Sequence, residues 1–337
     1  MTKNPITYLK RLLLVSVPGL AVALLFMEAA LRISGYTPYY LDARTFEPSQ
    51  VADMVFNLRP GFRGLYAGQL VSVNKLGFRS SETAEDIARS ALRIVVIGDS
   101  VAFGQGVKDG ETLPDQLAAR LRKRLPGPIA VVNLGVPMYD TCHEFAMFRE
   151  RAVPLNPQVA LLIYLDNDTD PLPLHIKDGA IVTPDTRTGL VGELMAMLRK
   201  SSAAYNFVWT HWQVAKVHRV TIDQYREMIA AKFNENNPGW RRSRGCLNDM
   251  VGLAKMRSIR LIVIPFPELG AIHQEPYPFR SYVKTVCDAA RAQGAECVDV
   301  VPTLKDANIR LRVNRIDLHP SAEVYARTAD FLEKMLP

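Results

Sequence analysis

The 337-residue sequence lacks the cysteine and histidine spacings that bind metals or exchange disulfides. It contains four cysteines and six histidines. None of the cysteines stands in a C-x-x-C pair, so zinc-binding and thioredoxin-type functions have no support. His143, His175, His211, His218 and His273 form no H-E-x-x-H motif or other ligand spacing, and we interpret them as scattered structural or surface residues. The sequence therefore predicts neither a metal nor an organic cofactor.

A calcium loop is also missing, although Asp166, Asp168 and Asp170 alternate as they do at the start of such a loop. Pro171 stands where the turn of the loop needs glycine, and Lys177 stands where the bidentate glutamate belongs. We therefore do not expect calcium.

The sequence has no basic tail, although its formal net charge is +7. The positive charges are spread along the chain, with local clusters at residues 120–124 and 241–244. Clusters of this size are typical of solvated helix faces. Nucleic acid is therefore not an expected partner.

One long apolar run is present, at residues 12–31, and it is interrupted only by Ser16, Pro18, Gly19 and Glu28. About twenty residues that rise 1.5 Å each are just long enough to cross a bilayer. This segment predicts an N-terminal transmembrane helix within an anchor at residues 1–35.

The charges that flank this run predict its orientation. Lys3, Lys10 and Arg11 precede it, and the positive-inside rule places such residues in the cytoplasm. A cleaved signal peptide is the alternative, but the stretch from Glu28 to Tyr36 has no good site of the A-x-A type. We favour an uncleaved, single-pass inner-membrane anchor with the rest of the chain periplasmic or extracytoplasmic.

All four cysteines then lie on the side of the membrane where thiols can oxidise. Cys287 and Cys297 fall on a predicted helix and on the strand that follows it, close enough for one disulfide. Four buried free thiols, including Cys142 and Cys246, are an alternative that the sequence leaves open.

Two regions follow the anchor. Residues 36–91 are rich in proline, glycine and arginine and predict an extended, membrane-proximal collar, in which Leu70 to Val73 reads as a strand or part of a hairpin. From Leu92 to the end, at residues 92–337, short apolar runs alternate with segments of helical spacing. The expected strands are at residues 93–97, 129–133, 159–164, 259–264 and 296–300, and the expected helices include residues 113–125, 279–293 and 321–335. This alternation predicts an α/β fold, with a parallel sheet and helices on both of its faces.

The alternation stops between about residues 171 and 248, which we interpret as an insertion at the strand ends, where lids and specificity elements usually lie. It contains the aromatic residues Tyr205, Phe207, Trp209, Trp212 and Trp240. We interpret them mostly as packing residues, with sugar stacking or membrane contact as the alternatives.

Ser100 is the candidate nucleophile. It lies in Gly98-Asp99-Ser100, directly after a buried strand, where parallel sheets form their ligand-binding crevice. A serine hydroxyl needs a base to remove its proton. Asp317 and His319 lie on the loop before the last helix, and at this spacing the carboxylate can bind Nδ1 and leave Nε2 facing the serine.

Acyl transfer also needs donors for the oxyanion of the tetrahedral intermediate. Gly135 follows the second strand, and its amide can point into the crevice because it has no side chain. Asn167 follows the third strand and offers its side-chain amide. With the backbone amide of Ser100, these make three candidate donors.

These blocks together resemble the SGNH (GDSL) hydrolase superfamily: Gly-Asp-Ser after the first strand, Gly135 after the second, Asn167-Asp168 after the third, and Asp317-Leu318-His319 at the end. Two departures are visible. One residue instead of two separates Asp317 from His319, and Leu165 stands where the family has glycine. The stretch from Asn74 to Arg79 also resembles the leader of membrane-anchored bacterial members. The resemblance implies a flavodoxin-like three-layer sandwich.

The resemblance also implies hydrolysis or transfer of an acyl ester through an acyl-Ser100 intermediate, with His319 as base and Asp317 as its orienting partner. With the predicted topology, it indicates an esterase for acyl groups, chiefly O-acetyl groups, on an envelope glycan or lipid-linked glycan. An O-acyltransferase that uses the same intermediate is one alternative. A non-catalytic glycan-binding scaffold protein is the other.

Overall fold

The computed structural model describes residues 5–36, 44–171, 175–177, 180–182, 190–217, 219–305 and 308–337. The chain divides into two compact units, which we describe separately. The helical unit comprises residues 1–40 and 185–218, and the sheet unit comprises residues 41–184 and 219–337.

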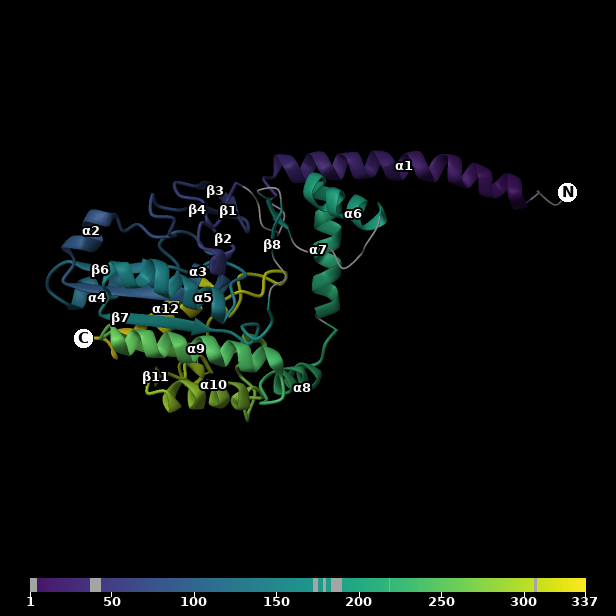
Figure 1. Ribbon diagram of the computed structural model, residues 1–337. Helices are drawn as coiled ribbons and strands as arrows, with labels where there is room; N and C mark the ends of the chain where they lie inside the picture. The colour runs from purple at the N-terminus through teal and green to yellow at the C-terminus, as the bar shows by residue number, and fades with distance from the viewer. Residues whose placement is uncertain are drawn as a thin grey trace. The chain divides into compact units, whose positions relative to one another are not determined.

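A five-stranded parallel sheet forms the centre of the sheet unit (Figure 1). The strand order is β11-β10-β7-β5-β6, with bounds Leu92–Gly98 (β5), Ile129–Asn133 (β6), Val159–Tyr164 (β7), Arg260–Pro265 (β10) and Glu296–Cys297 (β11). Every residue of β6 and β7 is buried. Continuous β-branched and aliphatic runs form these strands because helices cover both faces of the sheet.

Helices flank the sheet as the alternating pattern predicts. The bounds of the sheet unit's helices are Ala84–Arg89 (α2), Ser100–Phe103 (α3), Leu113–Arg124 (α4), Thr141–Met147 (α5), Ile222–Lys232 (α8), Pro238–Met256 (α9), Arg280–Ala292 (α10), Val301–Lys305 (α11) and Ala322–Glu333 (α12). Helix α4 packs against α12, while α5 packs against α9, and α9 against α10. Right-handed crossovers between parallel strands place α4 and α12 on one face of the sheet and α5, α9 and α10 on the other. The predicted three-layer α/β sandwich is thereby confirmed.

The segment before the sheet packs into the same unit. It forms two antiparallel pairs, Phe46–Pro48 (β1) with Phe56–Leu58 (β2) and Arg63–Tyr66 (β3) with Gln69–Ser72 (β4). The predicted strand at Leu70 to Val73 is therefore one arm of a hairpin. A third short pair joins His175–Lys177 (β8) to Ala180–Val182 (β9).

The helical unit contains Pro5–Ile33 (α1), Leu190–Ser201 (α6) and Ala203–Val217 (α7). Within α1, the stretch Ser16–Ile33 has a mean hydropathy of 1.6 and is long and apolar enough to cross a membrane. Most of its described side chains are exposed.

The segment predicted as an insertion, residues 171–248, is divided between the two units. Helices α6 and α7 belong to the helical unit, whereas β8, β9, α8 and the start of α9 belong to the sheet unit. Helix α9 begins at Pro238 because the Asn237 side chain accepts hydrogen bonds from the amides of Gly239 and Trp240. The fully buried Trp240 is a packing residue.

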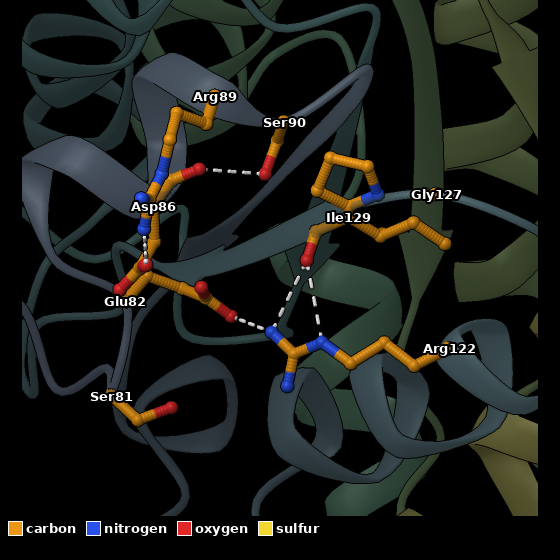
Figure 2. Close-up of a pocket in the computed structure, with 9 residues that line it drawn as sticks. Ser81, Glu82, Asp86, Arg89, Ser90, Arg122, Gly127 and Ile129 are labelled. Carbon is orange, nitrogen blue, oxygen red and sulfur yellow. Dashed lines mark hydrogen bonds and ion pairs between the residues drawn. The ribbon is translucent and has the colours of Figure 1, made fainter.

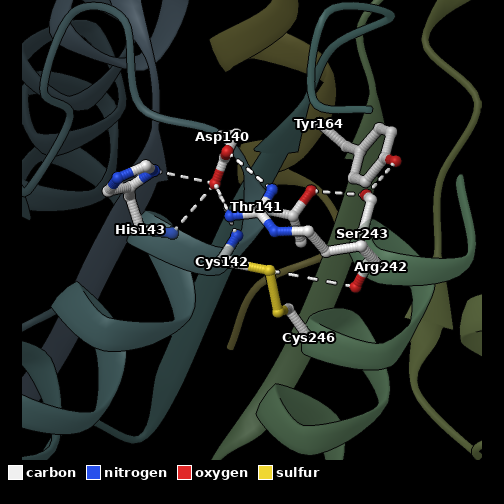
Figure 3. The surroundings of a disulfide bond; sticks show 8 residues. All are labelled: Asp140, Thr141, Cys142, His143, Tyr164, Arg242, Ser243 and Cys246. Atoms are coloured by element: carbon white, nitrogen blue, oxygen red, sulfur yellow. Dashed lines mark hydrogen bonds and ion pairs between the residues drawn. A yellow bond between two sulfur atoms is a disulfide. The ribbon is translucent and has the colours of Figure 1, made fainter. Parts of the chain in front are cut away.

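Both disulfides lie in the sheet unit, and Cys287–Cys297 is the pair for which the sequence left a disulfide open. Cys142–Cys246, which the sequence did not predict, joins α5 to α9 and spans 104 residues (Figure 3). No cysteine is free. In the loop-closure description, a crosslink over about a hundred residues stabilises the folded state by about 4.7 kcal/mol, because it lowers the entropy of the unfolded chain.

Asp140 binds the two helices together beside this disulfide (Figure 3). It accepts hydrogen bonds from the His143 ring and from the Arg242 guanidinium, each at 2.8 Å. Burial alone would raise the pKa of Asp140, but the bonds from these two side chains lower it to about 2. His143 is therefore a buried structural partner of this carboxylate.

Two other carboxyl groups in this region lack such partners. Glu144, on α5, and Asp168, after β7, are completely buried. Among the described residues, nothing hydrogen-bonds to either Glu144 oxygen or to Oδ1 of Asp168. Burial, and then the neighbouring charge of Asp168, raises the pKa of Glu144 well above its ordinary value. Burial, and then the charge of Asp99, does the same for Asp168. This pair therefore retains protons that ordinary carboxyl groups release.

Replacing Glu144 should change how stability depends on pH. A group whose pKa is higher in the folded protein than in the unfolded chain stabilises the folded protein by binding a proton. This stabilisation is complete below the pKa of the unfolded chain and is lost as the pH rises through the pKa of the folded protein. The free energy of unfolding should therefore fall as the pH rises above about 5, by up to about 1.4 kcal/mol per pH unit for each proton involved. Glu144→Gln should make this slope shallower.

Denaturant unfolding of the detergent-solubilised protein across this pH range measures the slope. The exposed Glu85→Gln on α2 is the matched control and should leave the slope as it is. Equal slopes for wild type and Glu144→Gln would contradict the assignment.

Candidate active site

The chain makes a sharp turn after β5 and places Ser100 at the first position of α3. Gly98 has a φ of 153°, and a Cβ there would lie 2.7 Å from the Cβ of Ala102 and 2.9 Å from the Ile163 carbonyl oxygen. Only glycine fits this position. The Asp99 side chain caps α3 by accepting a hydrogen bond from the amide of Val101 at 2.9 Å. The turn therefore presents the Ser100 hydroxyl beyond the carboxyl end of the strand.

His319 meets this hydroxyl from the other end of the domain. Its Nε2 lies 2.8 Å from Oγ of Ser100, a residue 219 positions away in the sequence. Its Nδ1 lies 2.6 Å from Oδ1 of Asp317. The Asp317 side chain is almost completely buried, while about a quarter of the His319 side chain is exposed. This is the geometry in which an acid orients a base toward a nucleophile.

The proton on the imidazole can be assigned from these distances. Gln105 Nε2 also lies near Nδ1, but at 3.4 Å, which is much longer than the 2.6 Å to Asp317. We therefore place the proton on Nδ1, donated to Asp317, and treat Gln105 as a neighbour of the ring. Nε2 is then free to accept the proton of Ser100.

The loop that carries Asp317 is itself held by side chains. Asn314 Oδ1 accepts hydrogen bonds from the amides of Ile316 and Asp317 at 2.7 and 2.8 Å. Gly106, with a φ of +82°, lies against this loop, and a Cβ there would come within 2.9 Å of Oδ2 of Asp317. The loop after the nucleophile and the loop of the base are therefore in close contact.

Asp99 joins the nucleophile to the loop after β7. Its Oδ2 accepts hydrogen bonds from the Ser100 hydroxyl at 3.2 Å and from Nδ2 of Asn167 at 3.3 Å. Burial raises the pKa of Asp99, and the hydrogen bonds to its carboxylate, the first of them from the Val101 amide, act against this rise. Asn167 therefore lies beside Ser100, with its amide directed at Asp99.

Gly135 packs directly against the backbone of α3. A Cβ at Gly135 would lie only 2.2 Å from the amide nitrogen of Phe103. Its own amide donates to Oδ1 of Asn133 at 2.9 Å, and Asn133 in turn donates to the Phe103 carbonyl at 3.2 Å. An oxyanion would have to share or exchange the Gly135 amide with Asn133.

Arg79 and Tyr66, from the segment before the sheet, support the region after Ser100. The buried Arg79 guanidinium donates to the carbonyls of Gly104 and Val107 and lies 4.7 Å from the centre of the Phe103 ring. The Tyr66 hydroxyl donates to Gln105 Oε1 at 3.4 Å. Sequence patterns gave no role to Gln105 or Tyr66, and Arg79 was noted only as part of a leader-like motif.

A surface pocket elsewhere on the sheet unit is separate from this site (Figure 2). It includes Gly127, Pro128 and Ile129, which lie at the amino end of β6, whereas Ser100 follows the carboxyl end of β5. Arg122 bridges the pocket by binding Glu82 and the Ile129 carbonyl. The pocket is at the opposite edge of the sheet and contains no nucleophile–base pair.

The three carboxylates of the rejected calcium loop have separate surroundings. Asp166 accepts a hydrogen bond from the Tyr225 hydroxyl, Asp170 pairs with Lys232, and Asp168 is buried next to Glu144. Among the described residues, no group of three or more histidine, cysteine, aspartate or glutamate side chains could hold a metal ion.

Solved structures similar to this one have low sequence identity to it. A putative lipolytic protein of the G-D-S-L family from Desulfitobacterium hafniense is 16% identical, with 72% of this chain and 99% of that chain covered and a TM-score of 0.42. A lipase/acylhydrolase from Enterococcus faecalis is 15% identical, with 73% of this chain and 97% of that chain covered and a TM-score of 0.42. A catalytic mutant of an acetylxylan esterase from Geobacillus stearothermophilus is 16% identical, with 73% of this chain and 94% of that chain covered and a TM-score of 0.42.

A search of curated proteins finds no relative of the chain. The model of the GDSL-like lipase/acylhydrolase family, in contrast, matches residues 96–327, which is more than half of the chain. The match extends from the strand before Ser100 to the helix after His319. The chain therefore belongs to the GDSL-like lipase/acylhydrolase family.

Proposed function

We propose that this hydrolase cleaves acyl esters through an acyl-Ser100 intermediate. The observation that carries the proposal is the hydrogen-bonded series from Ser100 through His319 to Asp317. As Oγ attacks the ester carbonyl, His319 Nε2 takes its proton and then gives it to the leaving alcohol. Water attacks the acyl-serine in the second half of the reaction, with the same nitrogen as base.

The tetrahedral intermediate needs hydrogen-bond donors at its oxyanion. The amide of Ser100 begins α3 and is one of the groups that a helix leaves without an intrahelical acceptor. The Asn167 side chain and the Gly135 amide are the other two donors we propose. Each is now bonded to a carboxylate or amide oxygen, so substrate binding would exchange one acceptor for another.

The substrate we propose is a short acyl ester, chiefly an O-acetyl group, on an envelope glycan or lipid-linked glycan. Gln105 and Asn167, which lie next to the nucleophile and base, are polar, whereas binding a long alkyl chain needs an apolar channel. The apolar stretch within α1, the basic residues that come before this stretch in the sequence and the two disulfides favour an extracytoplasmic location, where thiols oxidise.

Replacing the nucleophile should abolish turnover. Ser100→Ala should lower kcat on a small aryl acetate by at least about 10³, because the attacking oxygen is lost. Ser81→Ala, an exposed serine in the pocket of Figure 2, is the control and should retain full activity. A fluorophosphonate should add its mass to the peptide containing Ser100 in wild type only. Equal rates for Ser100→Ala and wild type would instead indicate a binding protein without turnover.

Asp317→Asn tests the orienting carboxylate. The asparagine amide can donate to Nδ1 and stabilise the wrong tautomer, so kcat should fall by about 10² to 10⁴ while KM changes little. Steady-state kinetics on the folded variant, with folding checked by circular dichroism, measure this. Asp330→Asn, on α12 and paired with Arg120, should keep wild-type kcat. A kcat for Asp317→Asn equal to that of wild type would remove Asp317 from the mechanism.

Chain-length selectivity tests the substrate. For acetylated oligosaccharides and aryl acetates, kcat/KM should exceed that for long-chain acyl esters by at least about tenfold, which corresponds to about 1.4 kcal/mol of transition-state binding. Faster cleavage of the long-chain esters would reject the O-acetyl proposal without affecting the role of Ser100. Acetyl transfer to an added sugar in place of hydrolysis would identify an acyltransferase.

A further inference from the structure

Helix α6 carries an apolar stripe that no described residue covers. Leu190, Leu194 and Met197 repeat at i, i+4 and i+7 on one side of the helix, and Val191 flanks them. These side chains are 51 to 86% exposed. Val208 and Trp212 on α7, at i and i+4, are about half exposed as well. Exposed apolar side chains that lie side by side on one helix mark an interaction site.

Residues 201–204 form the corner between α6 and α7, and hydrogen bonds join this corner to the C-terminal part of α1. The Glu28 carboxylate on α1 accepts hydrogen bonds from the Ser202 hydroxyl and from the amides of Ala203 and Ala204, at 2.8 to 3.1 Å. Arg32 bridges Glu28 and the Ser201 carbonyl, at 2.6 Å to each. Glu28 thus caps α7, which explains a carboxylate inside an apolar helix.

This connection fixes the depth of the corner along α1. Glu28 lies five residues before Ile33, where the apolar stretch ends. At 1.5 Å per residue this is about 8 Å. Helices that lie in a membrane interface bury their apolar face about 5 to 10 Å into the headgroup and acyl boundary. The corner is therefore at the depth of an interfacial helix.

The aromatic residues of α7 and the basic residues of α6 and α7 suit the same environment. The Trp209 and Trp212 rings lie 5.5 Å apart, with Arg199 over the first and Lys216 over the second. Tryptophan is enriched at membrane–water interfaces, and cations there attract anionic headgroups. Both kinds of residue stand on the helices that carry the exposed apolar side chains.

We propose that α6 and α7 dock on the lipid surface from which α1 emerges, with the α6 stripe among the acyl chains and the cations at the phosphates. The anchor is then a three-helix membrane module made of two distant segments, and not a single spanning helix. This goes beyond the proposed function, because it concerns where the protein lies and not what Ser100 does.

Site-directed spin labelling of the full chain tests the proposal. Since all native cysteines are in disulfides, Leu194→Cys supplies a single reactive thiol, and Val208→Cys is a second site should the first variant fail to fold. Met228→Cys on α8 of the sheet unit is the matched control, because Leu194 and Met228 are each 51% exposed. Each labelled protein is placed in vesicles of phosphatidylethanolamine and phosphatidylglycerol, and collisions with oxygen and with a water-soluble nickel chelate are measured.

The Leu194 and Val208 labels should show an oxygen-to-nickel collision ratio several-fold above that of the Met228 label. Equal ratios at the three positions would overturn the proposal. So would spin–spin broadening at Leu194 that disappears on dilution with unlabelled protein, since it would show that a second copy of the chain covers the stripe. Aryl acetate hydrolysis by the same samples reports on Ser100 separately, so the two proposals can fail independently.

Discussion

The hydrogen bond between Ser100 Oγ and His319 Nε2, 2.8 Å long, is the constraint on which the rest of the site depends. It joins the end of the first sheet strand to the loop before the last helix. Each residue alone is ordinary, because a serine hydroxyl is a weak nucleophile and a histidine on a loop has no fixed direction. The fold contributes by holding both at the same edge of the sheet.

Close backbone packing produces this proximity. Gly98, Gly106 and Gly135 each lie where a Cβ would approach a neighbouring atom to within 3 Å. Gly98 lets the chain turn over β7, Gly135 lets the end of β6 contact α3, and Gly106 lets the nucleophile loop reach Asp317. Without these contacts the two loops would stand farther apart. The glycines thus serve the geometry of the site and not only the shape of turns.

Arg79 adds a second kind of support, because its guanidinium donates hydrogen bonds to backbone carbonyls at the end of α3 and in the loop that follows it. Burial lowers the pKa of Arg79, and the Asp109 carboxylate opposes that effect. A segment that precedes the sheet in sequence is therefore part of the support of the nucleophile loop. This explains why residues 44–91 pack into the sheet unit and do not form a separate body.

The sequence predicts the sheet well because strands buried on both faces must be continuously apolar. β6 and β7 have the predicted bounds, and β10 begins one residue late. β11 is shorter than the predicted 296–300: Asp299 caps the next helix by accepting from the Val301 amide, which ends the strand. Local chemistry thus decides the edge of the sheet, where packing constrains the chain least.

Contacts between distant residues that stand in no recognisable motif are what the sequence could not predict. Ser100, Asp317 and His319 were identifiable because each stands in a short motif with a chemical rationale. Gln105, Tyr66 and the Cys142–Cys246 pair stand in none, and only the fold brings them to their partners. The same holds for Glu28, which in the sequence is only one of four interruptions of the apolar run, whereas in the structure it caps a helix whose Ala204 is 176 residues away.

The buried carboxylates of the sheet unit differ in their partners, and the partners decide their charge. Asp140 has cationic or ring N–H donors and a low pKa, whereas Glu144 has none and a raised pKa. Asp99 has hydroxyl and amide donors; burial raises its pKa, and the hydrogen bonds from these donors oppose the rise. The Asp99 carboxylate can hold the side chains of Ser100 and Asn167 next to each other. It does not compete strongly for the serine proton, because the Ser100–His319 hydrogen bond, at 2.8 Å, is shorter than the Ser100–Asp99 bond, at 3.2 Å. In the proposed mechanism Asp99 is therefore a positioning residue that aligns the nucleophile with an oxyanion donor, and His319 is the group that takes the proton.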